Sequence, residues 1–286
     1  ASSPLRALHD VPAPAKLNLF LHVVGRRSDG MHLLQSAFML IDWCDVLHFE
    51  LRKDGRIRRH DSGAALPASD LVVRAAELLR SKTGCSHGVD VHLEKNIPLQ
   101  AGLGGGSSNA ATTLLALNRL WDLNLGRQSL AQIGLALGAD VPFFIAGHNA
   151  WVEGVGEQAQ RIHLPAASFL VAKPPWGLGT GRVFAALTPA QWSDPATIAD
   201  FVAAPFAFGR NDLQEAACRV CPKMESALSL LSGSQLMARM TGAGSAVFAK
   251  LPDAGEPRQD VLDCPPRWQV RLCHNLMEHP LAHWAR

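Results

Sequence analysis

The chain has 286 residues, which is long for a single hydrophobic core and sufficient for two domains. It is 48% hydrophobic and 18% charged, with a net charge of +2, which excludes fibrous, disordered and strongly basic classes of protein. No apolar run approaches the length of a membrane span, and residues 1–10 lack the apolar stretch of a secretory signal. Among six scattered cysteines only Cys218 and Cys221 form a Cys-x-x-Cys pair, which favours reduced thiols over a zinc site. We therefore expect a cytoplasmic protein that binds neither membranes nor nucleic acids.

The first part of the chain is typical of strands followed by a helix. Residues 15–21 alternate between apolar and polar side chains, residues 46–51 resemble a second strand, and residues 71–79 carry a helical apolar stripe. The one basic run, 52–59, contains Asp54-Gly55, a hairpin-turn signal. We interpret this run as a solvated hairpin tip rather than a nucleic-acid patch.

The most informative segment is the glycine-rich stretch 97–111. A period-2 strand pattern over 89–95 precedes it, and helical apolar spacing from Ala110 to Trp121 follows it. A glycine loop between a strand and the first turn of a helix presents free amides at the positive end of the helix dipole, which predicts a polyphosphate site. No Gly-Lys-Ser/Thr follows, and Ser107 stands where the dinucleotide motif has its third glycine, so neither common phosphate motif is present. The alternative is a flexible linker, which rarely joins a strand directly to an apolar-striped helix.

The rest of the chain continues to mix helices and strands. Residues 130–137 predict a helix that ends at Gly138, and residues 150–155 predict a strand. Prolines at 165, 174 and 175 interrupt the pattern, and we place a domain boundary near residue 163, giving domains 1–163 and 164–286. In the second domain we expect strands at 169–172, 240–250 and 268–273, with helices at 211–219 and 223–231. Their alternation predicts a small α+β sandwich.

Three further segments carry candidate chemistry. Lys16 and Asn18 share one face of the strand 14–19, where an apolar environment makes a lysine costly unless it lies at an edge or pairs with an anion. Asp140 is the one carboxylate in the apolar octapeptide 137–144, where it either caps a helix before Val-Pro or acts as a shielded base. Residues 240–246 form a second glycine-rich turn, which is a weak signal alone.

Taken together and in this order, four motifs resemble the GHMP small-molecule kinases. They are Ala-Lys-Leu-Asn-Leu near the start, Pro-x-x-x-Gly-Leu-Gly-Gly-Gly-Ser-Ser, Gly-Ala-Asp-Val-Pro-Phe-Phe, and Thr-Gly-x-Gly-Ser near the end. The segment Gly-Arg-Arg-Ser-Asp-Gly-Met-His-Leu-Leu-Gln is similar to the branch of that family whose substrate is 4-diphosphocytidyl-2-C-methyl-D-erythritol. The similarity extends from about residue 12 to about residue 250.

The resemblance implies an α+β, two-domain GHMP kinase fold, with an N-terminal domain like ribosomal protein S5 domain 2 and a ferredoxin-like C-terminal domain. It implies transfer of the γ-phosphoryl group of ATP, with Mg²⁺, to the 2-hydroxyl of the erythritol moiety, in the non-mevalonate pathway to isoprenoid precursors. The expected partner is therefore a small-molecule substrate, and the expected state is a monomer or weak homodimer. No residue is assigned as a metal ligand, although the hydroxyl of Ser107 or Ser108 is within the loop that would meet the phosphates.

The resemblance also implies roles for individual residues. Asp140 matches the catalytic aspartate and Lys16 its partner, while Lys95 matches a lysine near the adenine. The ATP-phosphate loop is implied to comprise Pro98, Leu99, Gln100, Ala101, Gly102, Leu103, Gly104, Gly105, Gly106, Ser107 and Ser108. The implied substrate contacts are Asn18, Met31, His32, Thr180 and Phe184, with His32 beside the cytosine ring.

Three positions depart from the family pattern. Met31 stands where an aromatic residue is usual, Asp70 replaces an asparagine ahead of the helix 71–79, and Ala243 replaces a serine or threonine. One rival reading is a GHMP kinase for another alcohol, such as homoserine or mevalonate, which the Gly-Met-His segment disfavours. The other is a non-catalytic nucleotide-binding protein on the same fold. Retention of both Lys16 and Asp140 disfavours it, because a binder needs no base.

Overall fold

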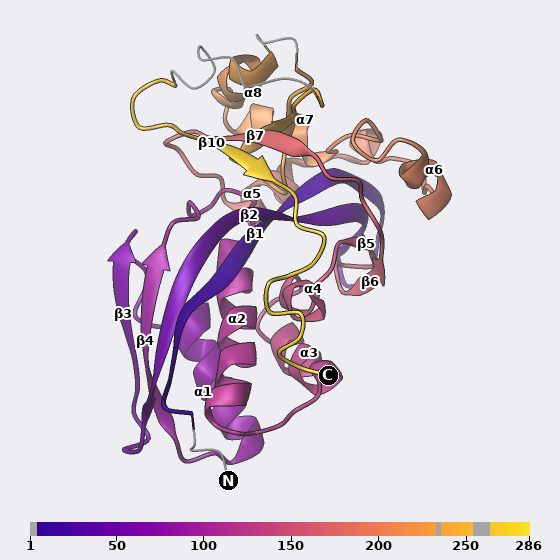
Figure 1. The fold of residues 1–286 in the computed structure, drawn as a ribbon. Helices are drawn as coiled ribbons and strands as arrows, with labels where there is room; N and C mark the ends of the chain where they lie inside the picture. The colour runs from indigo at the N-terminus through magenta and orange to yellow at the C-terminus, as the bar shows by residue number, and fades with distance from the viewer. Residues whose placement is uncertain (1–4, 233–235, 254–263) are drawn as a thin grey trace.

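The computed structural model describes residues 5–232, 236–253 and 264–286, which form two β-sheets with helices packed against them (Figure 1). The first half of the chain contains β1 (Ala7–Arg26), β2 (His32–Arg52), β3 (Ile57–Gly63), α1 (Leu71–Thr83), β4 (Gly88–Lys95), α2 (Gly105–Leu120), α3 (Arg127–Leu135), α4 (Val141–Ala146), β5 (Ala150–Glu153) and β6 (Gln158–Arg161). The second half contains β7 (Ser168–Lys173), α5 (Thr180–Ala186), the 3₁₀ helix η1 (Pro189–Gln191), α6 (Ile198–Ala203), α7 (Leu213–Val220), α8 (Met224–Ser232), β8 (Arg239–Met240), β9 (Val247–Lys250) and β10 (Gln269–His274).

The first sheet has the order β3-β4-β2-β5-β6, and β1 pairs with β2. The helices α1 and α2 pack together and lie along one face of this sheet (Figure 1). β1 and β2 form a long hairpin, because Arg27 N donates to Met31 O at 2.7 Å and closes a short loop between the paired residues Arg26 and His32. The hairpin extends from the first sheet to the second, so both of its strands contact both halves of the molecule.

The second sheet is antiparallel throughout and has the order β10-β7-β9-β8. A hydrophobic cluster between the two sheets includes Leu17 and Phe20 of β1, Met39 of β2 and Phe169 of β7, all of them fully buried. After β10 the chain returns to the first sheet, where Leu276 N donates to Leu40 O at 2.9 Å. The α+β class expected from the sequence is therefore confirmed, and the two halves are joined by a continuous core.

Most of the expected elements are present, but the expected hairpin after β2 is wrong. The chain does turn at Asp54-Gly55, where Gly55 has a φ of +73°, yet β4 lies between β2 and β3. The apolar side chains of β4 suit the interior position, whereas β3 is mostly exposed and suits the sheet edge.

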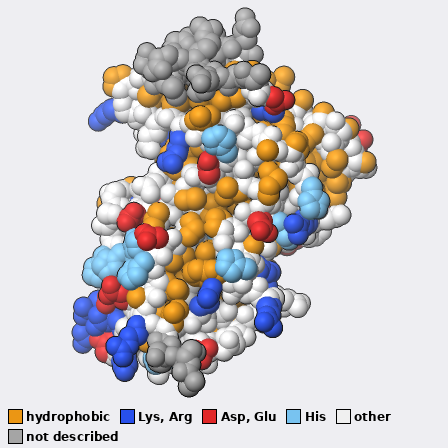
Figure 2. Space-filling view, in the orientation of Figure 1, with side chains coloured by type: hydrophobic (Ala, Val, Ile, Leu, Met, Phe, Trp, Pro, Cys, Tyr) orange, Lys and Arg blue, Asp and Glu red, His pale blue; other side chains and the backbone are white. Residues whose placement is uncertain are grey.

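Two arginines of the basic run form close ion pairs with carboxylates. Arg52 pairs with Asp90 at 2.6 Å, and Arg59 pairs with Asp61 and with Asp70, both at 2.6 Å. Figure 2 shows acidic, basic and histidine side chains side by side over the part of the surface where β3 and β4 lie. A surface of mixed charge agrees with a solvated edge.

Candidate active site

The backbone brings three of the sequence motifs together. Lys16 N on β1 donates to Leu103 O in the glycine loop at 2.9 Å. Ser245 N, in the turn between β8 and β9, donates to Gln100 O at 3.2 Å. The glycine loop is thus fixed between the first strand of the chain and a turn from its last third.

The glycines of this loop are required by close packing. Gly102 has a φ of +76°, and a Cβ there would lie 2.2 Å from Thr241 O. Gly104 has a φ of +71°, and a Cβ there would lie 3.0 Å from Lys16 Cγ and from Phe144 Cζ. Gly104 is also the N-cap of α2 and offers no side-chain cap, so the first amides of that helix remain free for a ligand. The flexible-linker alternative is therefore wrong.

Lys16 and Asp140 face each other across the site. Lys16 Nζ lies 3.9 Å from Asp140 Oδ2, donates a hydrogen bond to Asn18 Oδ1, and sits 4.9 Å from the centre of the Phe38 ring. Only 4% of Lys16 is exposed, so the solvated edge lysine considered from the sequence is wrong. Burial lowers the pKa of Lys16, and the charge of Asp140 opposes that shift.

Asp140 occupies the N-cap position of α4 but does not cap the helix. Its side chain makes no capping hydrogen bond, and 31% of it is exposed. The carboxylate faces the same cavity as Lys16. The sequence left open whether Asp140 caps a helix or acts as a base. Because the carboxylate makes no capping bond, it remains available for chemistry.

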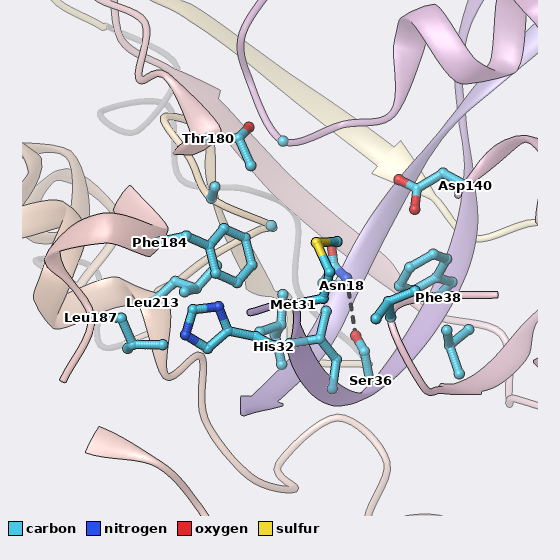
Figure 3. A pocket seen from close by; sticks show the side chains of 18 of the residues that line it. Asn18, Met31, His32, Ser36, Phe38, Asp140, Thr180, Phe184, Leu187 and Leu213 are labelled. Carbon is cyan, nitrogen blue, oxygen red and sulfur yellow. Dashed lines mark hydrogen bonds between the residues drawn. The ribbon is translucent and has the colours of Figure 1, made fainter. Parts of the chain in front are cut away.

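A hydrogen-bond network fixes Asn18 between the motifs. Its backbone N–H donates to Thr241 Oγ1 at 2.9 Å, and its Nδ2 donates to Ser36 Oγ at 2.9 Å. Ser36 Oγ in turn donates to Phe20 O at 2.5 Å. Because Nδ2 is committed to Ser36 (Figure 3), the amide oxygen of Asn18 is left to accept from Lys16.

A cavity of about 750 Å³ connects this pair to an aromatic site. In Figure 3, His32 and Phe184 lie at one end of the cavity, Asp140 and Phe38 at the other, and Asn18 between them. The rings of His32 and Phe184 are 5.3 Å apart at an interplanar angle of 32°. Met31 lines the same cavity and is 50% exposed.

The remaining substrate candidate, Thr180, also lines the cavity. It begins α5 and lies one helical turn before Phe184, so both side chains share a face of the helix. Burial lowers the pKa of His32, and the positive charge of Arg26 lowers it further. A neutral imidazole with one donor and one acceptor is suited to bind the edge of a base.

The phosphate-loop candidates divide into two groups. Gly102 and Gly104 line the cavity, whereas the others lie outside its lining, on the loop and the first turn of α2. Ser108 is fully buried, and its Oγ has no hydrogen-bond partner. An orphaned hydroxyl in the first turn of a helix with free amides fits a phosphate site.

Lys95 does not reach the cavity. Its ammonium forms a buried ion pair with Asp45, which also accepts from the backbone N–H groups of Asn96 and Ile97 at 2.6 and 2.7 Å. The pair lies beneath the glycine loop, since a Cβ on Gly105 would be 3.0 Å from Lys95 Nζ. Lys95 thus supports the loop from below.

Several residues of the site were missed from the sequence. Asp45 is a fully buried carboxylate between apolar residues of β2, and that pattern is its only sequence signal. Phe38, Ser36 and Arg26 line the cavity but stand in ordinary strand patterns. They become part of a site because segments far away in the chain, which carry Asp140, Thr180 and Phe184, line the same cavity.

One of the departures from the family pattern has a structural role, and a second is placed in the cavity wall. Asp70 caps α1 by accepting from the N–H groups of Val72 and Val73, both at 3.1 Å, and it pairs with Arg59. Its carboxylate is therefore used in the fold. Ala243 lies in the cavity wall and is 7% exposed.

Known proteins resemble this chain in both sequence and structure. Residues 70–148 match the family model "GHMP kinases N terminal domain". The 4-diphosphocytidyl-2-C-methyl-D-erythritol kinase of Paracidovorax citrulli (strain AAC00-1) is 56% identical over 285 residues, which cover 98% of this chain and 99% of that protein. The chain belongs to the 4-diphosphocytidyl-2-C-methyl-D-erythritol kinase family. It is a small-molecule kinase, and membership of the GHMP kinases implies that it uses ATP.

Solved structures agree with this family and its fold. A crystal structure of 4-(cytidine 5'-diphospho)-2C-methyl-D-erythritol kinase superposes with a TM-score of 0.78 at 30% identity, covering 92% of this chain and 98% of that one. The L. major mevalonate kinase in complex with R-mevalonate superposes with a TM-score of 0.70 at 14% identity, covering 98% and 99%, which shows the shared fold alone. In the described part of the chain, no helix has both the length and the apolar character needed to cross a bilayer.

Proposed function

We propose that this chain transfers the γ-phosphoryl group of ATP to the 2-hydroxyl of 4-diphosphocytidyl-2-C-methyl-D-erythritol, in the non-mevalonate route to isoprenoid precursors. One observation carries the proposal. A single cavity has a lysine–carboxylate pair at one end and two facing aromatic rings, His32 and Phe184, at the other. This arrangement suits a substrate with a reactive alcohol at one end and a planar base at the other. Neither homoserine nor mevalonate contains such a base.

The reaction needs a base for the hydroxyl proton and positive charge near the transferred group. Asp140 is the base in this proposal, because its carboxylate faces the cavity and makes no capping bond. Lys16 keeps Asp140 ionised and stabilises the developing negative charge. Asn18 holds the ammonium of Lys16 in place through its amide oxygen.

ATP supplies the phosphoryl group, and the glycine loop fits its phosphates. In the proposal, the free amides at the start of α2 and the unpartnered Oγ of Ser108 bind the phosphate oxygens. Residues 98–108 form the loop, and Lys95 supports it from below through Asp45.

Mg²⁺ is proposed as the accompanying ion. Within the described residues no group of three or more His, Cys, Asp or Glu side chains is placed to hold a metal. The ion would therefore be held mainly by phosphate oxygens and water, as Mg²⁺ prefers, with a hydroxyl such as that of Ser107 or Ser108 as the nearest protein donor.

The remaining proposals concern the protein as a whole. We propose two domains that meet near residue 163, a cytoplasmic location, a monomer or weak homodimer, and no nucleic-acid or membrane partner. All six cysteines are free thiols, which supports a reducing compartment. The near-neutral net charge and the pairing of Arg52 and Arg59 with carboxylates offer little to a nucleic acid.

A coupled ADP-release assay tests the proposed reaction. The purified chain would be incubated with ATP, Mg²⁺ and, in turn, the cytidyl-linked alcohol, homoserine and mevalonate. We expect turnover with the first alone, and turnover slower by about two to four orders of magnitude in Asp140→Asn. Faster turnover of homoserine or mevalonate would overturn the assignment of substrate, and ADP release independent of any alcohol would overturn the assignment of reaction.

A further inference from the structure

Among the described residues that line the cavity, one positive charge is not already committed. Its lining contains one lysine, Lys16, and one arginine, Arg26. Lys16 is buried and engaged by Asn18 and Asp140. Among the described residues Arg26 has no carboxylate partner, and its Nε donates to Gly30 O at 2.9 Å.

Arg26 is positioned beside the aromatic end of the cavity. It is the last residue of β1 and pairs directly with His32, the first residue of β2. Directly paired residues of an antiparallel sheet project to the same face, so the guanidinium and the imidazole project together. The bond from Nε to Gly30 O fixes the inner end of the guanidinium and leaves both terminal NH₂ groups available.

We propose that Arg26 is a specificity-determining residue that binds a phosphate oxygen of the substrate's nucleoside diphosphate. The inference rests on the proposed function. A base held against the paired rings of His32 and Phe184 places its 5′-phosphates one ribose away, within reach of a long arginine side chain. A guanidinium with two free NH₂ groups suits bidentate binding of a phosphate.

The electrostatics of the site agree with this position. After burial, the charge of Arg26 is the second cause that lowers the pKa of His32. Its guanidinium therefore lies close enough to the ring site to act on a ligand bound there.

The neighbouring arginine provides a matched control. Arg27 forms an ion pair with Asp29 at 2.5 Å and is not part of the cavity lining. Asp29 also accepts from Met31 N at 3.1 Å, so this pair shapes the loop between β1 and β2. Arg27→Gln removes the same charge from the adjacent position without removing the group that faces the cavity.

The experiment compares Arg26→Gln, Arg26→Lys and Arg27→Gln with the unmodified chain. Steady-state KM and kcat would be measured for the cytidyl-linked alcohol and for ATP, and binding of cytidine and cytidine diphosphate by calorimetry. We expect Arg26→Gln to raise the KM of the alcohol about tenfold, as for loss of one charge-assisted hydrogen bond, with the ATP KM unchanged. The same variant should also bind cytidine diphosphate more weakly, while its affinity for cytidine should not change. Arg26→Lys should recover part of the loss, because an ammonium keeps the charge without the fork.

Several outcomes would overturn the inference. It is wrong if Arg26→Gln leaves the KM of the alcohol unchanged, if Arg27→Gln raises it equally, or if the unmodified chain binds cytidine as tightly as cytidine diphosphate. Failure of the unmodified chain to phosphorylate the cytidyl-linked alcohol would instead contradict the proposed function. In that case the calorimetry with cytidine diphosphate still decides whether Arg26 binds its phosphates.

Discussion

Lys16 Nζ lies 3.9 Å from Asp140 Oδ2, and the two residues come from β1 and from the turn before α4. The lysine is almost completely buried, whereas the carboxylate is about one-third exposed, toward the cavity. A small molecule that entered the cavity would therefore meet Asp140 directly and Lys16 behind it. The pair has the arrangement of a base whose ionisation is supported by a fixed positive charge.

Asp140→Asn should reduce kcat by about two to four orders of magnitude, which is the usual contribution of a positioned general base. The fold should survive, because the carboxylate makes no capping hydrogen bond in α4. The measurements are kcat from ADP release, ATP affinity by calorimetry and the melting temperature. Asp70→Asn is the control, because Asp70 caps α1 away from the cavity, and it should affect stability rather than turnover. Near-normal turnover in Asp140→Asn would refute its role as the base.

Lys16→Met should also abolish most activity while filling the buried space that the lysine stem occupies. If Lys16 and Asp140 act as one unit, the double variant should be little slower than either single variant. The four kcat values of the double-mutant cycle measure this coupling. Multiplicative losses in the double variant would show that the two residues act independently.

The sequence predicted those parts of the site that are continuous in the chain. The strand around Lys16, the glycine loop and the segment before α4 each carry a local pattern, and the structure brings them together. A lysine in an apolar strand remained ambiguous at that stage, because burial depends on what packs over the strand. The loop carbonyl Leu103 O and the Phe38 ring, which meet Lys16, belong to other segments.

The order of the strands in the first sheet could not be predicted from local sequence patterns. The turn at Asp54-Gly55 predicted that β2 and β3 would pair, yet β4 lies between them. The same limit hid Asp45, whose partner Lys95 is on β4. Lys95 was assigned to the adenine by resemblance alone, and in the structure its side chain forms a buried ion pair with Asp45.

Gly105→Val should strongly weaken ATP binding and leave the affinity for the alcohol largely intact. A side chain at Gly105 would meet Ile97 Cγ2 and Lys95 Nζ, both 3.0 Å from its Cβ, so the loop must shift away from its support. Calorimetric ATP binding to folded protein is the measurement. Gly126→Ala is the control, because Gly126 is the N-cap of α3 and its Cβ would make an ordinary contact of 3.5 Å. An unchanged dissociation constant for ATP would contradict the phosphate-loop assignment.

The free energy of unfolding should decrease as the pH is lowered below neutrality, partly because of His279. Burial lowers the pKa of His279 from 6.5 to about 4, and its Nδ1 accepts from Leu281 N at 3.0 Å. Above pH 6.5 this histidine is neutral in both the folded and unfolded states and has no effect. As the pH falls from 6.5 to 4, the unfolded state takes up the proton first, so the free energy of unfolding decreases, by up to about 3 kcal/mol.

Urea unfolding at a series of pH values measures this slope. His279→Gln should flatten it between pH 6.5 and 4, whatever its effect on stability at pH 7. His283→Gln, which changes an exposed histidine of the same C-terminal segment, is the matched control and should keep the slope. Equal slopes in all three proteins would show that His279 is not responsible.

Met31→Tyr should lower the KM of the cytidyl-linked alcohol a few-fold and leave the ATP KM unchanged. A base stacked on an aromatic ring gains about 1–3 kcal/mol, whereas a methionine sulfur against a ring gains about 0.3–1.5 kcal/mol. Met31 is half exposed and lines the cavity beside His32, so a tyrosine has room there and should not overpack the core. The melting temperature should therefore stay constant while the substrate KM falls. Exposed Met277, outside the cavity lining, provides Met277→Tyr as the control, with both KM values unchanged. A Met31→Tyr protein with a lower melting temperature and an unchanged substrate KM would place the base elsewhere in the cavity.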